Sequence, residues 1–151
     1  MSDITDEVDK AIEALGLVPE VRRLPDVHER LLYSELVGEF LSGKDRRWWW
    51  EAFTKPSASV LFSDSMGFKH IPELVPSATE PCWFMVEDSE SDTYPIYEAT
   101  PELASKIIGE CFAFEYYLIA KDKRWFLCEN HHGLVIGIGP DVVEAINHVT
   151  A

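Results

Sequence analysis

Apolar positions near the start of the chain repeat at the intervals of a helix. In residues 3–15 they are spaced by four, four and three positions: Ile4, Val8, Ile12 and Leu15. A helix brings residues at these spacings to one face. A second stripe, formed by Leu32, Leu36 and Phe40, follows an acid-x-x-Glu sequence that is typical of a helix start at Asp26. We therefore expect an N-terminal region of two helices, the second of which ends near Ser42.

The middle of the chain has a weaker pattern. Residues 57–62 form a short run, Ser-Ala-Ser-Val-Leu-Phe, that predicts a strand. Residues 67–81 contain three prolines, Pro72, Pro76 and Pro81, and predict a long surface connection that crosses the domain without regular structure.

The C-terminal half alternates between apolar runs and turn sequences. The apolar runs predict strands over residues 82–88, 94–98, 112–120, 124–130 and 134–138, the first two of them joined as a hairpin. Thr100-Pro101-Glu102 and Pro140-Asp141 are typical helix starts, with Leu103, Ile107, Ile108, Val142, Val143 and Ile146 as the expected buried positions. Alternation within the later strands is imperfect, which indicates a central sheet covered on both faces.

These elements predict one α+β domain over residues 1–151. Its sheet is mostly antiparallel with about five or six strands, and the N-terminal helical region is joined by two further helices. Hydrophobic residues make up 46% of the chain and charged residues 26%, which excludes a disordered chain and a disulfide-dense miniprotein. Three cysteines at wide spacing favour reduced, mostly buried thiols. No apolar run is long enough for a membrane span, and the acidic N-terminus lacks secretory features, so we expect a cytoplasmic protein.

Charge adds a functional hint. The formal net charge is −14, and residues 61–100 alone hold eight acidic side chains against one basic side chain. Such an anionic surface disfavours nucleic acid and anionic membranes, and favours fast, salt-sensitive association with a basic partner. Acidity that merely keeps the protein soluble is the alternative interpretation.

Three consecutive tryptophans, Trp48, Trp49 and Trp50, stand apart from the periodic segments. In a helical turn Trp49 and Trp50 share a face with Phe53, whereas Trp48 points elsewhere, and in a strand Trp49 opposes its two neighbours. The three rings therefore cannot all enter one core face. Trp48 either covers a second surface of the same fold or contributes to an interface, where tryptophan is enriched.

The sequence Cys128-Glu129-Asn130-His131-His132 is the most reactive-looking cluster. Cys128 and His131 have a spacing that zinc ligands use, but no second Cys/His pair follows. Cys128 as a nucleophile needs an electropositive environment, which the neighbouring Glu129 opposes. A structural interpretation has Cys128 buried, Asn130 and His131 in turn hydrogen bonds, and Gly133 in an unusual backbone conformation. A partner-facing role for the two histidines is the remaining alternative.

The pattern Glu115-Tyr116-Tyr117-Leu118-Ile119, followed by Trp125-Phe126-Leu127-Cys128-Glu129-Asn130-His131-His132, resembles small bacterial proteins of uncharacterised families and, more distantly, immunity proteins of the SUKH type. The resemblance covers roughly residues 80–150 and rests on the strand pattern. It implies an α+β immunity domain that binds and blocks a cognate toxin, with no catalytic residues to carry over.

The sequence therefore leads to a binding protein, and not an enzyme, as the first hypothesis. We expect a basic toxin domain, for example a nuclease, as partner, without cofactor, metal, nucleic acid or membrane. The expected electrostatic contacts are Glu87, Asp88, Glu90 and Asp92, with Trp48 or Trp50 as an anchor. The alternatives are a small metal- or thiol-dependent enzyme centred on Cys128, His131 and His132, and a homo-oligomeric adaptor, such as a homodimer, that uses the aromatic patch.

Overall fold

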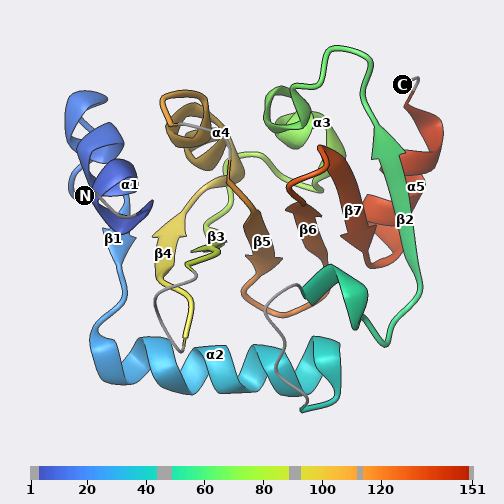
Figure 1. Cartoon of the computed structure of the whole chain (residues 1–151), viewed down its shortest axis with the longest axis horizontal. Helices are drawn as coiled ribbons and strands as arrows, with labels where there is room; N and C mark the ends of the chain where they lie inside the picture. Colours follow the sequence, from blue (N-terminus) through green and yellow to red (C-terminus); the bar gives the residue numbers. More distant parts are fainter. Residues whose placement is uncertain (1–3, 44–48, 89–92, 112–113, 150–151) are drawn as a thin grey trace.

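The computed structural model describes residues 4–43, 49–88, 93–111 and 114–149. Its centre is one antiparallel sheet with the strand order β1-β4-β3-β5-β6-β7-β2 (Figure 1). The strands are β1 (Arg22–Arg23), β2 (Ser57–Leu61), β3 (Cys82–Val86), β4 (Ile96–Ala99), β5 (Tyr116–Ala120), β6 (Phe126–Glu129) and β7 (Leu134–Ile138). The α+β class and the antiparallel sheet are confirmed, and the described sheet has seven strands rather than five or six.

Helices cover both faces of the sheet, so the fold has three layers (Figure 1). The helices are α1 (Ile4–Ala14), α2 (Asp26–Leu41), α3 (Ile71–Leu74), α4 (Pro101–Gly109) and α5 (Pro140–His148), with two 3-10 segments, η1 (Trp49–Glu51) and η2 (Gly67–His70). Helices α1, α3, α4 and α5 share one core cluster, and α2 packs with Trp49 on the opposite face. The two expected N-terminal helices and the two expected later helices are all present.

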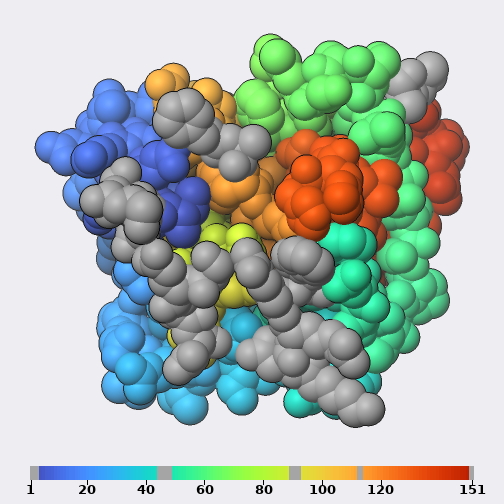
Figure 2. Space-filling model, viewed as in Figure 1, coloured from blue at the N-terminus to red at the C-terminus, as the bar shows by residue number. Residues whose placement is uncertain are grey.

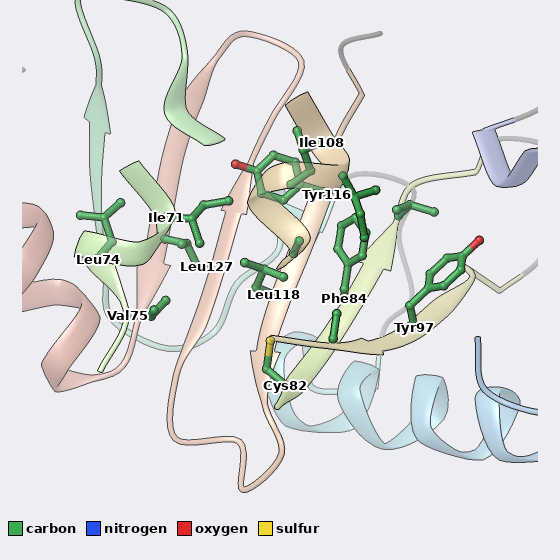
Figure 3. Close-up of a cluster of buried hydrophobic side chains, with 14 of the residues drawn as sticks. Ile71, Leu74, Val75, Cys82, Phe84, Tyr97, Ile108, Tyr116, Leu118 and Leu127 are labelled. Carbon is green, nitrogen blue, oxygen red and sulfur yellow. The ribbon is translucent and has the colours of Figure 1, made fainter. Parts of the chain in front are cut away.

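Strand β5 is the middle strand of the sheet and is covered on both faces. All five of its residues are buried, because alternate side chains enter the two core clusters. Figure 3 shows Tyr116 and Leu118 of this strand in the first cluster, close to Phe84 and Leu127 of the neighbouring strands. This confirms the central, doubly covered sheet that the imperfect alternation predicted.

The connection over residues 67–81 is different from the prediction. It contains η2 and α3, and Ile71 and Leu74 are each only 1% exposed. Pro72 occupies the first turn of α3. Backbone N–H groups in the first turn of a helix have no partner within the helix, so a proline there costs no hydrogen bond. The prediction was wrong here because it counted this proline as a breaker rather than as a helix start.

Strand β1 and the start of α2 are fixed by a buried carboxylate. Glu29 is 2% exposed, pairs with Arg23 through two hydrogen bonds of 3.0 and 3.1 Å, and accepts a hydrogen bond from the backbone N–H of Ile96. This ion pair raises the pKa of Arg23 above its ordinary value. Helix α2 begins at Asp26, as the sequence predicted, although no side chain caps its first turn and Glu29 instead pairs with Arg23.

Candidate functional site

Segments from four parts of the chain meet at one end of the sheet. They are η1, the residues after β3, the start of β5 and the turn between β6 and β7. The backbone N–H of Glu87 donates to the carbonyl of Glu115 at 3.0 Å, which extends the β3–β5 pairing beyond Val86. Residues opposite each other on paired strands project to the same face, so Glu87 and Glu115 share a face. In Figure 2 the orange-red β6–β7 turn lies beside the teal η1 segment.

Glu115 is the centre of this arrangement. Its side chain is only 3% exposed, yet its carboxylate has donors on three sides. The indole N–H of Trp50 donates to Oε1 at 3.1 Å, the Tyr117 hydroxyl donates to the same oxygen at 3.4 Å, and the His131 backbone N–H donates to Oε2 at 3.2 Å. The Nδ1 atom of His131 also contacts Oε2. The buried carboxylate is therefore satisfied, as a buried charge must be.

Three rings gather around that carboxylate. The Trp50 ring centroid lies 5.9 Å from the centroids of both His131 and His132, and the two imidazoles are 4.0 Å apart. Trp50 is half-buried, whereas His131 and His132 are exposed. We call the surface formed by Trp50, His131 and His132, together with Glu87 on the face of Glu115, the Trp50 surface; Asp88 follows Glu87 at the same end of the sheet.

The turn that carries the histidines is shaped by Asn130. Its side-chain oxygen accepts from the backbone N–H groups of His132 and Leu134, each at 3.0 Å. Gly133 has a φ of +79°, which favours glycine at this position. These contacts agree with the structural interpretation of the turn made from sequence. Because Glu115 also binds the backbone of His131, the turn is fixed from both sides.

Cys128 does not take part in surface chemistry. It is 1% exposed, and burial raises its pKa well above the ordinary thiol value, with Glu115 nearby adding to the effect. A thiolate is the reactive form of cysteine, so the burial of Cys128 and its raised pKa oppose a nucleophilic role for this thiol. All three cysteines are free, as expected. Within the described ranges, no group of three or more His, Cys, Asp or Glu residues is arranged to hold a metal ion.

The sequence predicted only part of this site. Of the expected contact residues, Trp50, Glu87 and Asp88 lie at the same end of the sheet, whereas Trp48, Glu90 and Asp92 lie outside the described residues. His131 and His132, which were assigned to a competing hypothesis, contact the same tryptophan. The adjacent Trp49 is fully buried against Tyr33, Tyr117 and Phe126 and belongs to the core. Glu115 was missed as a site residue, although a carboxyl at the start of a wholly apolar strand is a signal for a buried polar role.

A groove of about 620 Å³ lies at the opposite end of the sheet, beside the β5–β6 turn. Its lining includes Lys121, Arg124 and Trp125, together with residues of the 76–81 segment and the start of α5. Lys121 pairs with Glu98, and Arg124 pairs with Asp122 at 3.3 Å. Its two cationic side chains are thus paired within the protein, and the groove is separate from the Trp50 surface.

Comparison with known proteins gives one match. A family model described as "Family of unknown function (DUF6756)" matches residues 2–150. No curated protein and no solved structure matches the chain. Within the described residues, no helix is both long and apolar enough to cross a membrane.

Proposed function

The chain belongs to the DUF6756 family, whose function is unknown, and we propose that it is an immunity-type binding protein that neutralises a basic toxin domain through the Trp50 surface. The observation that supports this proposal most directly is the Trp50 ring, which a buried carboxylate fixes at a surface beside acidic residues. A tryptophan that is ordered before binding loses little side-chain entropy when a partner covers it. Tryptophan is also enriched among the residues that dominate binding energies.

Charge supports a basic partner. Glu87 and Asp88 directly follow β3, and the whole protein carries a net charge of −14. An excess of negative charge attracts a cationic protein and speeds the diffusional encounter. Nuclease domains hold a phosphate backbone with basic side chains, so an acidic protein can occupy that surface in place of the nucleic acid. A nuclease toxin is therefore the partner class that we propose.

Affinity capture is the first experiment. The tagged protein is incubated with lysate of its source organism at low and high salt, and retained proteins are identified by mass spectrometry. Retention of one basic, toxin-like domain, weakened by salt, is the expected result. The toxic activity of that retained domain should then fall when the purified chain is added in equimolar amounts. Full toxin activity in the presence of excess bound chain would contradict the proposal.

Charge reversal then tests the location of the contact. Glu87→Lys with Asp88→Lys is compared with Asp141→Lys with Glu144→Lys, which changes the net charge equally but on the exposed start of α5. The first pair is expected to lower the association rate at low salt by about tenfold or more, and the second pair far less. Equal association rates for the two double variants would remove the Trp50 surface from the proposal. Trp50→Ala should raise the dissociation rate by about tenfold or more, as loss of an anchor does.

A further inference from the structure

The two edges of the sheet are protected to very different degrees. The edge strand β1 has two residues, both of them exposed arginines, and Arg22 pairs with Glu98 at 3.2 Å. Short length and positive charge are the common means by which proteins prevent a sheet edge from pairing with another chain. The edge strand β2, at the right of Figure 1, has five residues that pair with β7 in an unbroken register. In the described parts of the chain, no strand pairs with its other side.

The sequence of β2 has none of the usual protective features. Residues 57–63 contain no charge and no proline, in a chain in which 26% of the residues are charged. The side chains of Ser57, Ser59 and Leu61 are exposed on one face, and Leu61 is 57% exposed. An uncharged edge of this length presents backbone donors and acceptors to a further strand. Its lack of protection therefore indicates that the edge is used.

The strand is suited to pair with a copy of itself. In an antiparallel pair centred on Ser59, all five residues are matched: Ser59 faces Ser59, Ala58 faces Val60, and Ser57 faces Leu61. This register also brings the Lys55 end of one strand toward the Asp64 end of the other, where Lys55 already pairs with Glu39 and Asp64 with His70 within each copy. A net charge of −14 opposes contact between two copies over most of the surface, but residues 52–63 contain one basic residue and no acidic residue.

From these observations we propose that β2 is a self-association surface, at which a second copy of the chain adds its own β2 in antiparallel orientation and joins the two sheets into one. The contact consists of backbone hydrogen bonds between the two edges, with the exposed Leu61 side chain covered by the partner strand. It lies on the edge beyond β7 and uses none of the residues that define the Trp50 surface, although Leu61 lies beside Gly133 of the β6–β7 turn. The inference does not rest on the proposed function.

A charge at the centre of the pair tests this proposal. Ser59 is exposed, so Ser59→Lys and Ser59→Asp place like charges opposite each other in the dimer without burying them in the monomer. Like charges directly opposite each other on paired strands are destabilising, and we expect the dimer dissociation constant to rise by about fivefold or more in each variant. Mixing the two variants should restore a dimer at least as stable as the native one. Ser34→Lys on the exposed face of α2 is the matched control, which should leave dimerisation unchanged.

The measurement is sedimentation velocity over a wide range of protein concentration, supported by hydrogen exchange of the β2 amides. The expected result is a concentration-dependent dimer whose β2 amides become better protected as the dimer forms. A native protein that remains monomeric at about 1 mM would overturn the proposal, as would a dimer that Ser59→Lys and Ser59→Asp leave unchanged. The mixing experiment separates a lost contact from a damaged fold, because misfolded variants would not form a mixed dimer.

Discussion

Glu115 joins the Trp50 surface to the core, and its removal offers a quantitative test of that role. Glu115→Ala leaves the Trp50 indole N–H, the Tyr117 hydroxyl and the His131 backbone N–H without their acceptor. A hydrogen bond to a charged group contributes about 1.5–3 kcal/mol, and removal of one member of a buried charged network costs about 3–5 kcal/mol. Neighbouring side chains relax and solvent replaces part of the lost contact, so the energies of the three hydrogen bonds do not add fully. We therefore expect the free energy of unfolding to fall by about 3–5 kcal/mol at neutral pH.

Glu115→Gln provides the matched comparison. It preserves the shape of the side chain and one acceptor oxygen, but it places an NH₂ group among hydrogen-bond donors. The expected loss is about 1–2 kcal/mol, smaller than for alanine. Glu13→Ala, an exposed position on α1, should change stability by less than about 0.5 kcal/mol.

Urea denaturation followed by circular dichroism measures all three variants, because this signal does not depend on the tryptophan environment. A double-mutant cycle that combines Glu115→Ala with Trp50→Phe should give a coupling energy above about 0.5 kcal/mol, since the indole N–H donates directly to the carboxylate. A loss below about 1 kcal/mol for Glu115→Ala, with no coupling to Trp50, would refute the role that the geometry gives to this carboxylate.

Three further predictions concern the fold. Gly139→Ala should destabilise the protein by about 2–4 kcal/mol in urea denaturation, because a Cβ would lie 2.2 Å from the Arg124 carbonyl oxygen, whereas Gly43→Ala, with open space around it, should cost about 1 kcal/mol. Burial raises the pKa of Glu129, so the folded state binds this proton more tightly than the unfolded state, and native stability should fall relative to Glu129→Gln as the pH rises above the ordinary glutamate value; parallel pH profiles would contradict this. Thiol titration of the native protein at pH 8 should detect Cys111 alone, slowly because its pKa is raised to about 11, and Cys111→Ser should abolish that signal until denaturant exposes the other two thiols.

Periodicity was sufficient to predict the elements with strong patterns. Val8 and Ile12 of α1, Leu36 and Phe40 of α2, and Ile107 of α4 are buried as their spacing required. Thr100 caps α4 by accepting from the Leu103 N–H at 3.2 Å, as the Thr-Pro-Glu sequence predicted. These features depend on neighbours along the chain, so local sequence contains the necessary information.

The elements that were missed depend on distant contacts. Strand β1 consists of two arginines and exists because it pairs with β4, with Arg22 opposite Glu98. Its short polar sequence has no strand pattern that could have revealed it. The contact between Glu115 and His131 depends on the β5–β6 register, in which Tyr116 lies opposite Glu129. Nothing in the local pattern specifies which carboxylate an exposed histidine will meet.

The strand order has a consequence for folding during synthesis. Strand β2 pairs with β7, so Ser57 cannot pair until Ile138 has been synthesised. Strand β1 pairs with β4, which places Arg22 opposite Glu98. Contacts between residues so far apart in sequence form late and slow the search for the native topology. The segments from β3 to β7 pair with near neighbours and can assemble first. Until β7 has been synthesised and has left the ribosome, a nascent chain holds an uncharged strand without its native partner, which makes that interval the period of greatest exposure to misassembly.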